Sequence, residues 1–213
     1  MGDHSKLGRE LDLFDSHPLI GAGLPVWLPA GAAVRAAIES YIKDEERRAG
    51  YQHVYSPPLG KRELYEMSGH WRHFADDMFE PVGGDLVLRP SLCPHHALIY
   101  ASRGRSYRDL PLRIAELGQM FRAERSGVVG GLTRVRCISL NDAHLFCPLP
   151  AVGAEVSAIL DMIERAYAAL GISSWRYRLS LRGGPDDPKY VAGRAGWDQA
   201  EAMLRAALIG RGV

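Results

Sequence analysis

Apolar and polar residues follow a helical period over two long stretches of the chain. In residues 31–49, apolar side chains recur three and four positions apart, opposite a charged face. This stripe consists of Val34, Ala37, Ile38, Tyr41 and Ile42. The spacing predicts a long amphipathic helix, and Gly50 is suited to end it as a C-cap residue. Residues 151–169 repeat the pattern and predict a second amphipathic helix.

Shorter patterned segments alternate with stretches rich in proline and glycine. Further helices are predicted at residues 3–14, 61–69, 93–104 and 197–209. Short strands are predicted at residues 51–57, 85–89 and 175–181. Residues 17–31 contain three prolines, so we expect a loop with one short strand there, and another loop at residues 183–188.

Two long segments without helix-capping signals lie in the middle of the chain. Residues 112–124 and 133–146 each predict a strand, and the linking residues 125–131 contain three glycines. We therefore expect two antiparallel strands joined by a glycine-rich loop. Because helices and strands do not alternate regularly, the pattern predicts an α+β fold. The expected architecture is an antiparallel sheet flanked by helices, in a single domain over residues 1–213.

The composition narrows the class of protein. The chain has 213 residues, 46% of them hydrophobic and 24% charged, which is typical of a globular domain. A net charge of +1 creates no strong field toward nucleic acid or a membrane surface. Three cysteines do not indicate a disulfide scaffold, so we expect a reducing, cytoplasmic location. No apolar run reaches the roughly 18 residues of a membrane span, and neither a P-loop nor a GxGxxG sequence occurs.

Charged residues gather where the two long strands are expected to face each other. Glu124 lies among four arginines, which are Arg122, Arg125, Arg134 and Arg136. Alternation would place Arg122 and Glu124 on one face of the first strand, and Arg134 and Arg136 on one face of the second. Converging guanidinium groups suit a phosphate, because each offers a planar fork of donors. A ladder of cross-strand salt bridges explains the same pattern, and the residues alone leave both interpretations open.

A candidate metal site combines residues that are far apart in the sequence. Cys93 and His144 are of the types that bind zinc, and further candidates accompany them, namely Asp142, His95 and His96. A buried thiol and a hydrogen-bonded histidine are the simpler explanation of the pair. The local sequence Cys-Pro-His-His could also hold a metal by itself. His70, in the segment SGHW, is either a proton acceptor or a structural cap at a helix end.

Taken in order, these segments resemble the catalytic domain of the threonyl-tRNA synthetases, a family of class II aminoacyl-tRNA synthetases. Residues 31–49 with GYQHVYSP are similar to class II motif 1, which builds the dimer interface in that family. ELYEMSGHW resembles the family's TGHW segment, and RPSLCPHH stands where the family has PMNCPGH. SYRDLPLRIAELGQMFRAERSG and GLTRVRCISLNDAHLFC resemble motif 2 and the strand after it. The similarity covers nearly the whole chain.

The resemblance implies roles in ATP binding and in transfer to tRNA. Arg122 matches the motif 2 arginine that holds the ATP α-phosphate, and Glu124 matches the glutamate at the adenine end. Arg134 lies in the matching RVR segment, which also contributes to the nucleotide site. His70 matches the histidine implicated in transfer to the tRNA ribose.

The resemblance also implies an amino-acid pocket. Cys93 and His144 match two of the family's three zinc ligands, and zinc in that family binds the amino and hydroxyl groups of threonine. This arrangement rejects valine, which has no hydroxyl group to bind. Asp142 matches the aspartate that accepts the threonine hydroxyl. Ser91 and Leu140 stand where the family has methionine and glutamine, so both are expected in the substrate site.

Departures from the family pattern limit what is expected of the chain. Ile138 replaces a phenylalanine that stacks on adenine, and the chain stops before motif 3, so an ATP-binding arginine and the third zinc ligand, a histidine, are missing. We therefore expect a threonine–tRNA ligase-like catalytic domain without its C-terminal part, incomplete as an enzyme in this form. It would use zinc, ATP and Mg²⁺ to activate threonine or a related amino acid for the 3′ end of tRNA.

Three further expectations concern assembly and alternative functions. The motif 1 resemblance implies a homodimer, although burial of the apolar stripe of residues 31–49 in the chain's own core explains that stripe equally well. One alternative function is a non-catalytic paralogue that acts as a binding or regulatory module. Another is an amino-acid-activating paralogue whose acceptor is not tRNA.

Overall fold

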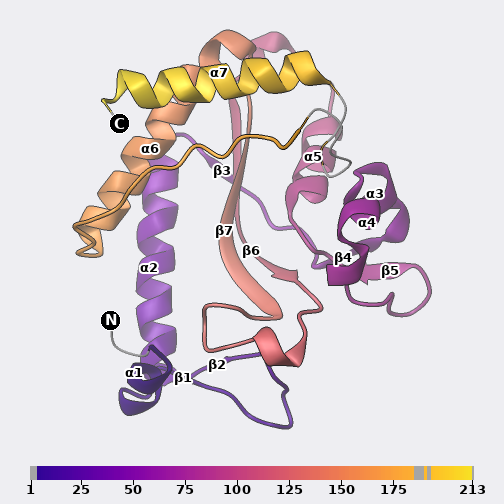
Figure 1. Cartoon of the computed structure of the whole chain (residues 1–213), viewed down its shortest axis with the longest axis vertical. Helices are drawn as coiled ribbons and strands as arrows, with labels where there is room; N and C mark the ends of the chain where they lie inside the picture. Colours follow the sequence, from indigo (N-terminus) through magenta and orange to yellow (C-terminus); the bar gives the residue numbers. More distant parts are fainter. Residues whose placement is uncertain (1–3, 185–189, 191–192, 213) are drawn as a thin grey trace. The chain divides into compact units, whose positions relative to one another are not determined.

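The computed structural model describes residues 4–184, 190 and 193–212, and it divides into two compact units (Figure 1). The first unit comprises residues 1–105 and 113–145, and the second comprises residues 106–112 and 146–213. The single-domain organisation stays a prediction. In the described part of the chain, no helix is both long enough and apolar enough to cross a membrane.

The helices predicted in the first unit at residues 3–14, 31–49, 61–69 and 93–104 are present with different ends, and the second of them begins inside the predicted loop of residues 17–31. The helices of this unit are α1 (His4–Glu10), α2 (Pro29–Arg48), α3 (Arg62–Met67), α4 (His70–Phe74), η1 (Ala75–Asp77, a 3₁₀ helix), α5 (Cys93–Ala101) and η3 (Ser126–Val128, a 3₁₀ helix). Pro29 occupies the first turn of α2, where its missing N–H needs no partner. Gly50 follows the end of α2 at φ 80°, a conformation that glycine adopts without strain.

Three small sheets complete the first unit. Their strands are β1 (Phe14–Asp15), β2 (Val26–Trp27), β3 (Gln52–His53), β4 (Leu59–Lys61), β5 (Leu86–Leu88), β6 (Leu112–Phe121) and β7 (Cys137–Phe146). β1 pairs with β2 and β4 pairs with β5, both antiparallel. The third sheet has the order β3-β6-β7, and β3 runs parallel to β6 (Figure 1). The α+β fold is confirmed, with this parallel pair as an addition to the antiparallel sheets that the sequence predicts.

The long strands are shorter than predicted, and this changes the position of the arginines. β6 ends at Phe121 and β7 begins at Cys137, so the four arginines and Glu124 lie in the segment between the strands. The prediction that alternation along a strand fixes their faces is therefore wrong. Residues 175–181 form no strand. Most of the predicted loop at residues 183–188 lies outside the described residues.

The apolar stripe of α2 is largely exposed. Val34 is 51% exposed and Ile38 is 39% exposed, and Ala37 between them is exposed too. Tyr41 and Ile42, one turn later, are half-buried. Burial in the chain's own core therefore does not explain the first half of the stripe.

A small buried cluster of apolar side chains lies in the first unit. Tyr65, Met78 and Val87 form this cluster, against which Trp71 packs. Tyr65 of α3 and Val87 of β5 are both fully buried, so their packing joins these two elements.

The second unit is built around two helices. Its elements are η2 (Tyr107–Asp109, a 3₁₀ helix), η4 (Leu149–Ala151, a 3₁₀ helix), α6 (Val152–Ala169) and α7 (Arg194–Gly210). Arg211, just after α7, pairs with Asp161 at 2.5 Å and with Glu164 at 2.9 Å on α6. The predicted helices at residues 151–169 and 197–209 are both confirmed, the second with an earlier start.

Candidate metal and amino-acid site

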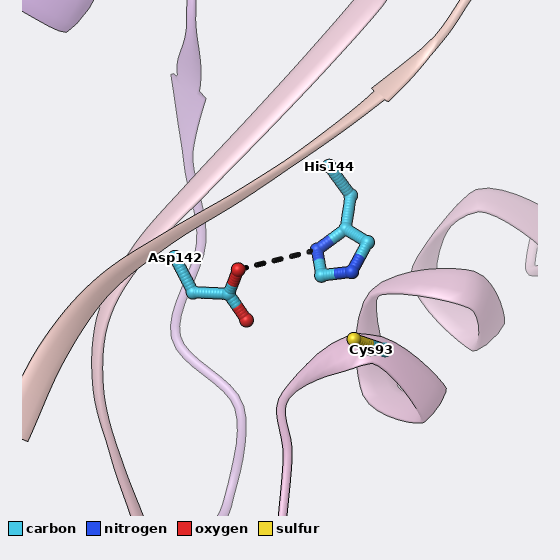
Figure 2. A group of neighbouring side chains, drawn as sticks. All are labelled: Cys93, Asp142 and His144. Carbon is cyan, nitrogen blue, oxygen red and sulfur yellow. Dashed lines mark ion pairs between the residues drawn. The ribbon is translucent and has the colours of Figure 1, made fainter. Parts of the chain in front are cut away.

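Three side chains with metal-binding atoms converge in the first unit. Cys93 begins α5, while Asp142 and His144 lie two residues apart on β7 and so project from the same face of that strand. The Cys93 sulfur, one Asp142 carboxylate oxygen and one His144 ring nitrogen all lie within 4.8 Å of one another (Figure 2). The fold thus brings together the two predicted metal ligands and the aspartate predicted to bind the substrate.

The start of α5 holds Cys93 at the surface. The Cys93 backbone N–H donates a hydrogen bond to Ser91 Oγ at 3.2 Å, and Pro94 follows in the first turn. The Cys93 side chain is exposed, so the alternative of a buried thiol is wrong. His95 points elsewhere, because it is buried with its ring 6.3 Å from that of Tyr65.

The environment of Cys93 favours its thiolate. A hydrogen bond with His144, and a second one with His70, lower the pKa of the Cys93 thiol to about 6, although partial desolvation of the thiol opposes them. The contact with Cys93 in turn raises the pKa of His144. His70, which begins α4, also lies 3.0 Å from Ser68 Oγ through its Nδ1. The thiolate is the form of cysteine that binds metals, so the arrangement suits a metal site.

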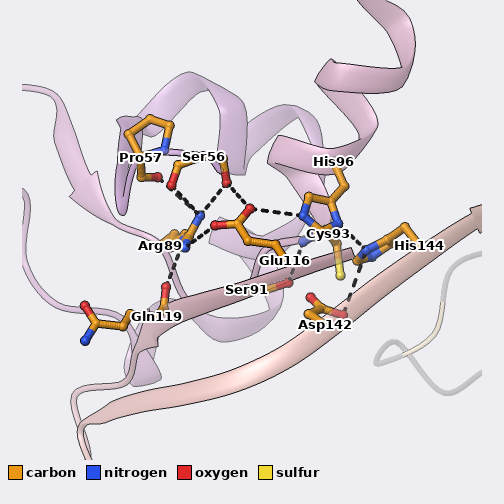
Figure 3. A network of polar contacts seen from close by, with 10 residues as sticks. All are labelled: Ser56, Pro57, Arg89, Ser91, Cys93, His96, Glu116, Gln119, Asp142 and His144. Carbon is orange, nitrogen blue, oxygen red and sulfur yellow. Dashed lines mark hydrogen bonds and ion pairs between the residues drawn. The ribbon is translucent and has the colours of Figure 1, made fainter. Parts of the chain in front are cut away.

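A chain of buried polar groups extends from His144 into the protein (Figure 3). His144 Nδ1 lies 2.8 Å from His96 Nδ1, and the two rings meet at 90°. His96 Nε2 lies 3.2 Å from Glu116 Oε2, and Glu116 Oε1 accepts a hydrogen bond from Arg89 Nη2 at 3.0 Å. His96, Glu116 and Arg89 are 0%, 3% and 2% exposed. His144 is therefore connected to a buried ion pair through His96.

The Glu116 carboxylate is stabilised from three sides. Burial raises the pKa of Glu116, but hydrogen bonds with Ser56, Arg89 and His96 outweigh burial and hold the pKa below its usual range. Ser56 Oγ donates to Glu116 Oε2 at 2.6 Å and accepts from Arg89 Nη1 at 2.6 Å. Because these donors offset the desolvation of the charge, Glu116 remains an ionised hydrogen-bond acceptor.

Sequence reasoning missed Arg89 and Glu116. Glu116 is a charged residue inside the apolar strand β6, and Arg89 directly follows the apolar strand β5. Charged side chains are rarely fully buried without a partner, so each was a signal that a partner existed elsewhere. The sequence did not identify that partner, because 27 residues separate the two positions.

The residues predicted to bind ATP lie in the segment between β6 and β7. Arg134 donates to Glu124 Oε2 through Nη2 at 2.8 Å and through Nε at 3.0 Å. Arg136 donates through Nε to the Glu124 carbonyl oxygen at 2.8 Å. The Arg122 N–H donates to the Arg136 carbonyl at 2.9 Å. The salt bridge that the sequence offered as an alternative therefore exists between Arg134 and Glu124, and the nucleotide roles stay predictions.

Leu140 lies on β7, two residues before Asp142. It also lines a groove together with Trp27 of β2 and Val34 and Ile38 of α2. Ser91 contacts Cys93 directly.

Comparison with known proteins assigns the fold to a family. The family described as tRNA synthetase class II core domain (G, H, P, S and T) matches residues 78–192, which is more than half of the chain. This chain belongs to the class II tRNA synthetase core domain family. The match includes β5 to β7 and α5, and therefore Cys93, Asp142 and His144.

Similar proteins include threonine–tRNA ligases. The chain is 50% identical to a threonine–tRNA ligase of Streptococcus sanguinis over 99% of its own length, and 49% identical to one of Halalkalibacterium halodurans over 97%. It spans only 33% and 32% of those two proteins. Among solved structures, the RNA binding domain of threonyl-tRNA synthetase from Cryptosporidium parvum matches with a TM-score of 0.87 and 33% identity. That match covers 99% of this chain and 52% of the other. The resemblance to the threonyl-tRNA synthetases is confirmed.

Proposed function

We propose that the chain acts as part of a threonine–tRNA ligase, which activates threonine with ATP and transfers it to the 3′ end of tRNA. The convergence of Cys93, Asp142 and His144 carries this proposal. Membership of the class II family and similarity to threonine–tRNA ligases support it. Three free cysteines agree with the reducing cytoplasm that we propose as its location.

The donor set fits zinc. A thiolate sulfur, an imidazole nitrogen and a nearby carboxylate are groups that zinc accepts, and a catalytic site keeps positions open for substrate. Cys93 and His144 would hold the ion, which would supply a Lewis acid that binds the amino and hydroxyl groups of threonine. The Asp142 carboxylate would accept a hydrogen bond from the threonine hydroxyl. Valine would leave that carboxylate unpaired, and this gives a physical basis for its rejection.

The segment between β6 and β7 is the proposed ATP site. Arg122 would neutralise charge on the α-phosphate, and Glu124 would accept a hydrogen bond from the exocyclic amine of adenine. Arg134, which pairs with Glu124, would contribute a further guanidinium group next to the nucleotide, which binds with Mg²⁺. His70 would accept a proton during transfer to the ribose, since a neutral imidazole offers a nitrogen lone pair as a base.

Zinc content and amino-acid titration test the proposal. We expect about one zinc per chain and calorimetric binding of threonine but not of valine, because only threonine has the hydroxyl group. Cys93→Ser should lose both zinc and threonine binding, and Asp142→Asn should lose threonine binding while it retains zinc. Cys137→Ser is the matched control, because Cys137 lies outside the cluster. A wild-type chain that binds neither zinc nor threonine would contradict the proposed pocket.

We also propose that the chain forms a homodimer through α2. The exposed half of the apolar stripe, with Val34 and Ile38, supports this, because burying such a surface against a second copy is favourable. Ile38→Glu should convert the dimer to a monomer in sedimentation velocity experiments. Leu19→Glu, which changes an apolar residue that is 92% exposed outside α2, should not. A wild-type protein that sediments as a monomer would refute the dimer.

A second candidate function is a binding module that does not activate its amino acid. It is favoured by Ile138, which replaces an adenine-stacking aromatic and so removes a contact worth about 0.5–1.5 kcal/mol. Pyrophosphate exchange separates the two candidates. Threonine-dependent exchange supports the ligase, whereas threonine binding without ATP binding supports the module.

A further inference from the structure

We propose that Glu116 and His96 act as a relay that fixes the tautomer of His144, and that Arg89 locks the relay in place. In this arrangement His144 carries its proton on Nδ1 and presents the lone pair of Nε2 on the side of the ring that faces Cys93 (Figure 2). Glu116, His96 and Arg89 are positioning residues for the proposed metal ligand His144. The effect of the relay on metal binding rests on the proposed metal site. The direction of its hydrogen bonds rests only on which groups are donors and which are acceptors.

The direction of each hydrogen bond follows from the groups present. An ionised carboxylate only accepts, so His96 Nε2, 3.2 Å from Glu116 Oε2, must be the donor. A neutral imidazole that donates from Nε2 has an acceptor at Nδ1. The His96 Nδ1 lies 2.8 Å from His144 Nδ1, which must therefore donate to it. Asp142 Oδ1 does not compete for this proton, because it is 3.9 Å from the same nitrogen.

Arg89 makes the opposite direction costly. Reversing the relay would require a protonated Glu116, yet the Arg89 guanidinium lies 3.0 Å from that carboxylate inside the protein. Arg89 itself is anchored at the Gln119, Ser56 and Pro57 carbonyl oxygens, at 2.5, 3.3 and 3.3 Å. Gly118 provides the space for this side chain, because a Cβ at that position would lie 2.8 Å from Arg89 Nη2. The fixed positive charge keeps Glu116 ionised and so keeps the relay in one direction.

The substitution Glu116→Gln tests the relay. A glutamine amide can either donate to His96 Nε2 or accept from it, so both tautomers of His144 become accessible. We expect zinc affinity, measured by competition with a chromophoric chelator, to fall about 10- to 100-fold, as for other changes behind a metal ligand. Glu46→Gln is a matched control. Glu46 is also buried, at 1% exposed, and pairs with His53 Nε2 at 2.7 Å away from the metal cluster. That variant should keep wild-type zinc affinity.

A second measurement reads the tautomer directly, without metal. Two-bond ¹⁵N–¹H spectra of histidine-labelled protein distinguish Nδ1–H from Nε2–H rings, and His144→Asn assigns the signal. The spectra are recorded at pH 8 on the Cys93→Ser protein, where no thiol shares a proton with His144. We expect His144 as the Nδ1–H tautomer, and a mixture of tautomers when Glu116→Gln is added.

The two measurements separate the relay from the metal site. An Nε2–H signal for His144 in the Cys93→Ser protein overturns the relay, even if the glutamine variant fails to fold. Equal zinc affinity in the wild type and Glu116→Gln overturns it too. Absence of zinc binding in the wild type, together with the Nδ1–H tautomer, overturns the proposed metal site and supports the relay.

Discussion

Replacing Arg89 by methionine should lower the free energy of unfolding by the amount that depends on the buried ion pair of Arg89 and Glu116. Methionine fills much of the space of the arginine stem but supplies no donor, so the change removes charge and hydrogen bonds more than volume. In the wild type, Arg89 makes five hydrogen bonds, including one to Glu116 at 3.0 Å, and it is 2% exposed. In the variant, the buried Glu116 carboxylate would keep only Ser56 and His96 as donors.

The size of the effect follows from the burial of both partners. Breaking a buried pair by removing one charge costs about 3–5 kcal/mol, because the other charge stays desolvated. A typical domain has about 5–15 kcal/mol of stability, so the variant should fold but unfold at much lower denaturant concentration. Arg47→Met is the control, because Arg47 pairs with Asp44 at 2.8 Å with a side chain that is 61% exposed. Exposed pairs contribute about 0–1 kcal/mol.

Urea unfolding followed by circular dichroism, on both variants and at several pH values, is the assay. Because the folded pKa of Glu116 lies below its unfolded value, its contribution to stability is present at neutral pH and is lost as pH falls through that range. The Arg89→Met penalty should therefore shrink as the pH falls through the acidic range, because a protonated Glu116 needs no cation. Adding Glu116→Gln should recover part of the loss at pH 7. A penalty below about 1 kcal/mol, equal to that of the exposed control, would refute the reasoning.

Two other substitution experiments follow from the site. In the metal-free chain, the rate of Cys93 alkylation by iodoacetamide should rise with a midpoint near pH 6, because hydrogen bonding lowers the pKa of the thiol to about 6. His144→Asn should move that midpoint upward, and an unmoved midpoint would show that His144 is not the cause. Gly118→Ala should destabilise by about 1–3 kcal/mol in urea unfolding, since the new Cβ would lie 2.8 Å from Arg89 Nη2. Gly153→Ala has open space around it and serves as the control, and an equal result for both glycines would contradict the steric argument.

Local chemistry lets the sequence predict the helices well. Gly50 marks the end of α2, and the sequence indicates it because glycine acts on the backbone within its own turn. The pattern places Pro29 in the preceding loop, whereas it occupies the first turn of the helix. The pattern extends β6 and β7 too far toward the segment that links them, since strand ends depend on pairing with other segments. The exposure of Val34 and Ile38 is also undetermined by the pattern, because periodicity shows that a helix has an apolar face without showing what covers it.

By itself, the sequence determined the class of the fold and the types of residue available for chemistry. Its resemblance to the threonyl-tRNA synthetases was enough to single out Cys93, Asp142 and His144. Only the tertiary structure decided that His144 is backed by His96, Glu116 and Arg89. The reason is physical. A buried charge is stable only beside donors that other segments deliver, and those segments meet only when β5, β6 and α5 pack together.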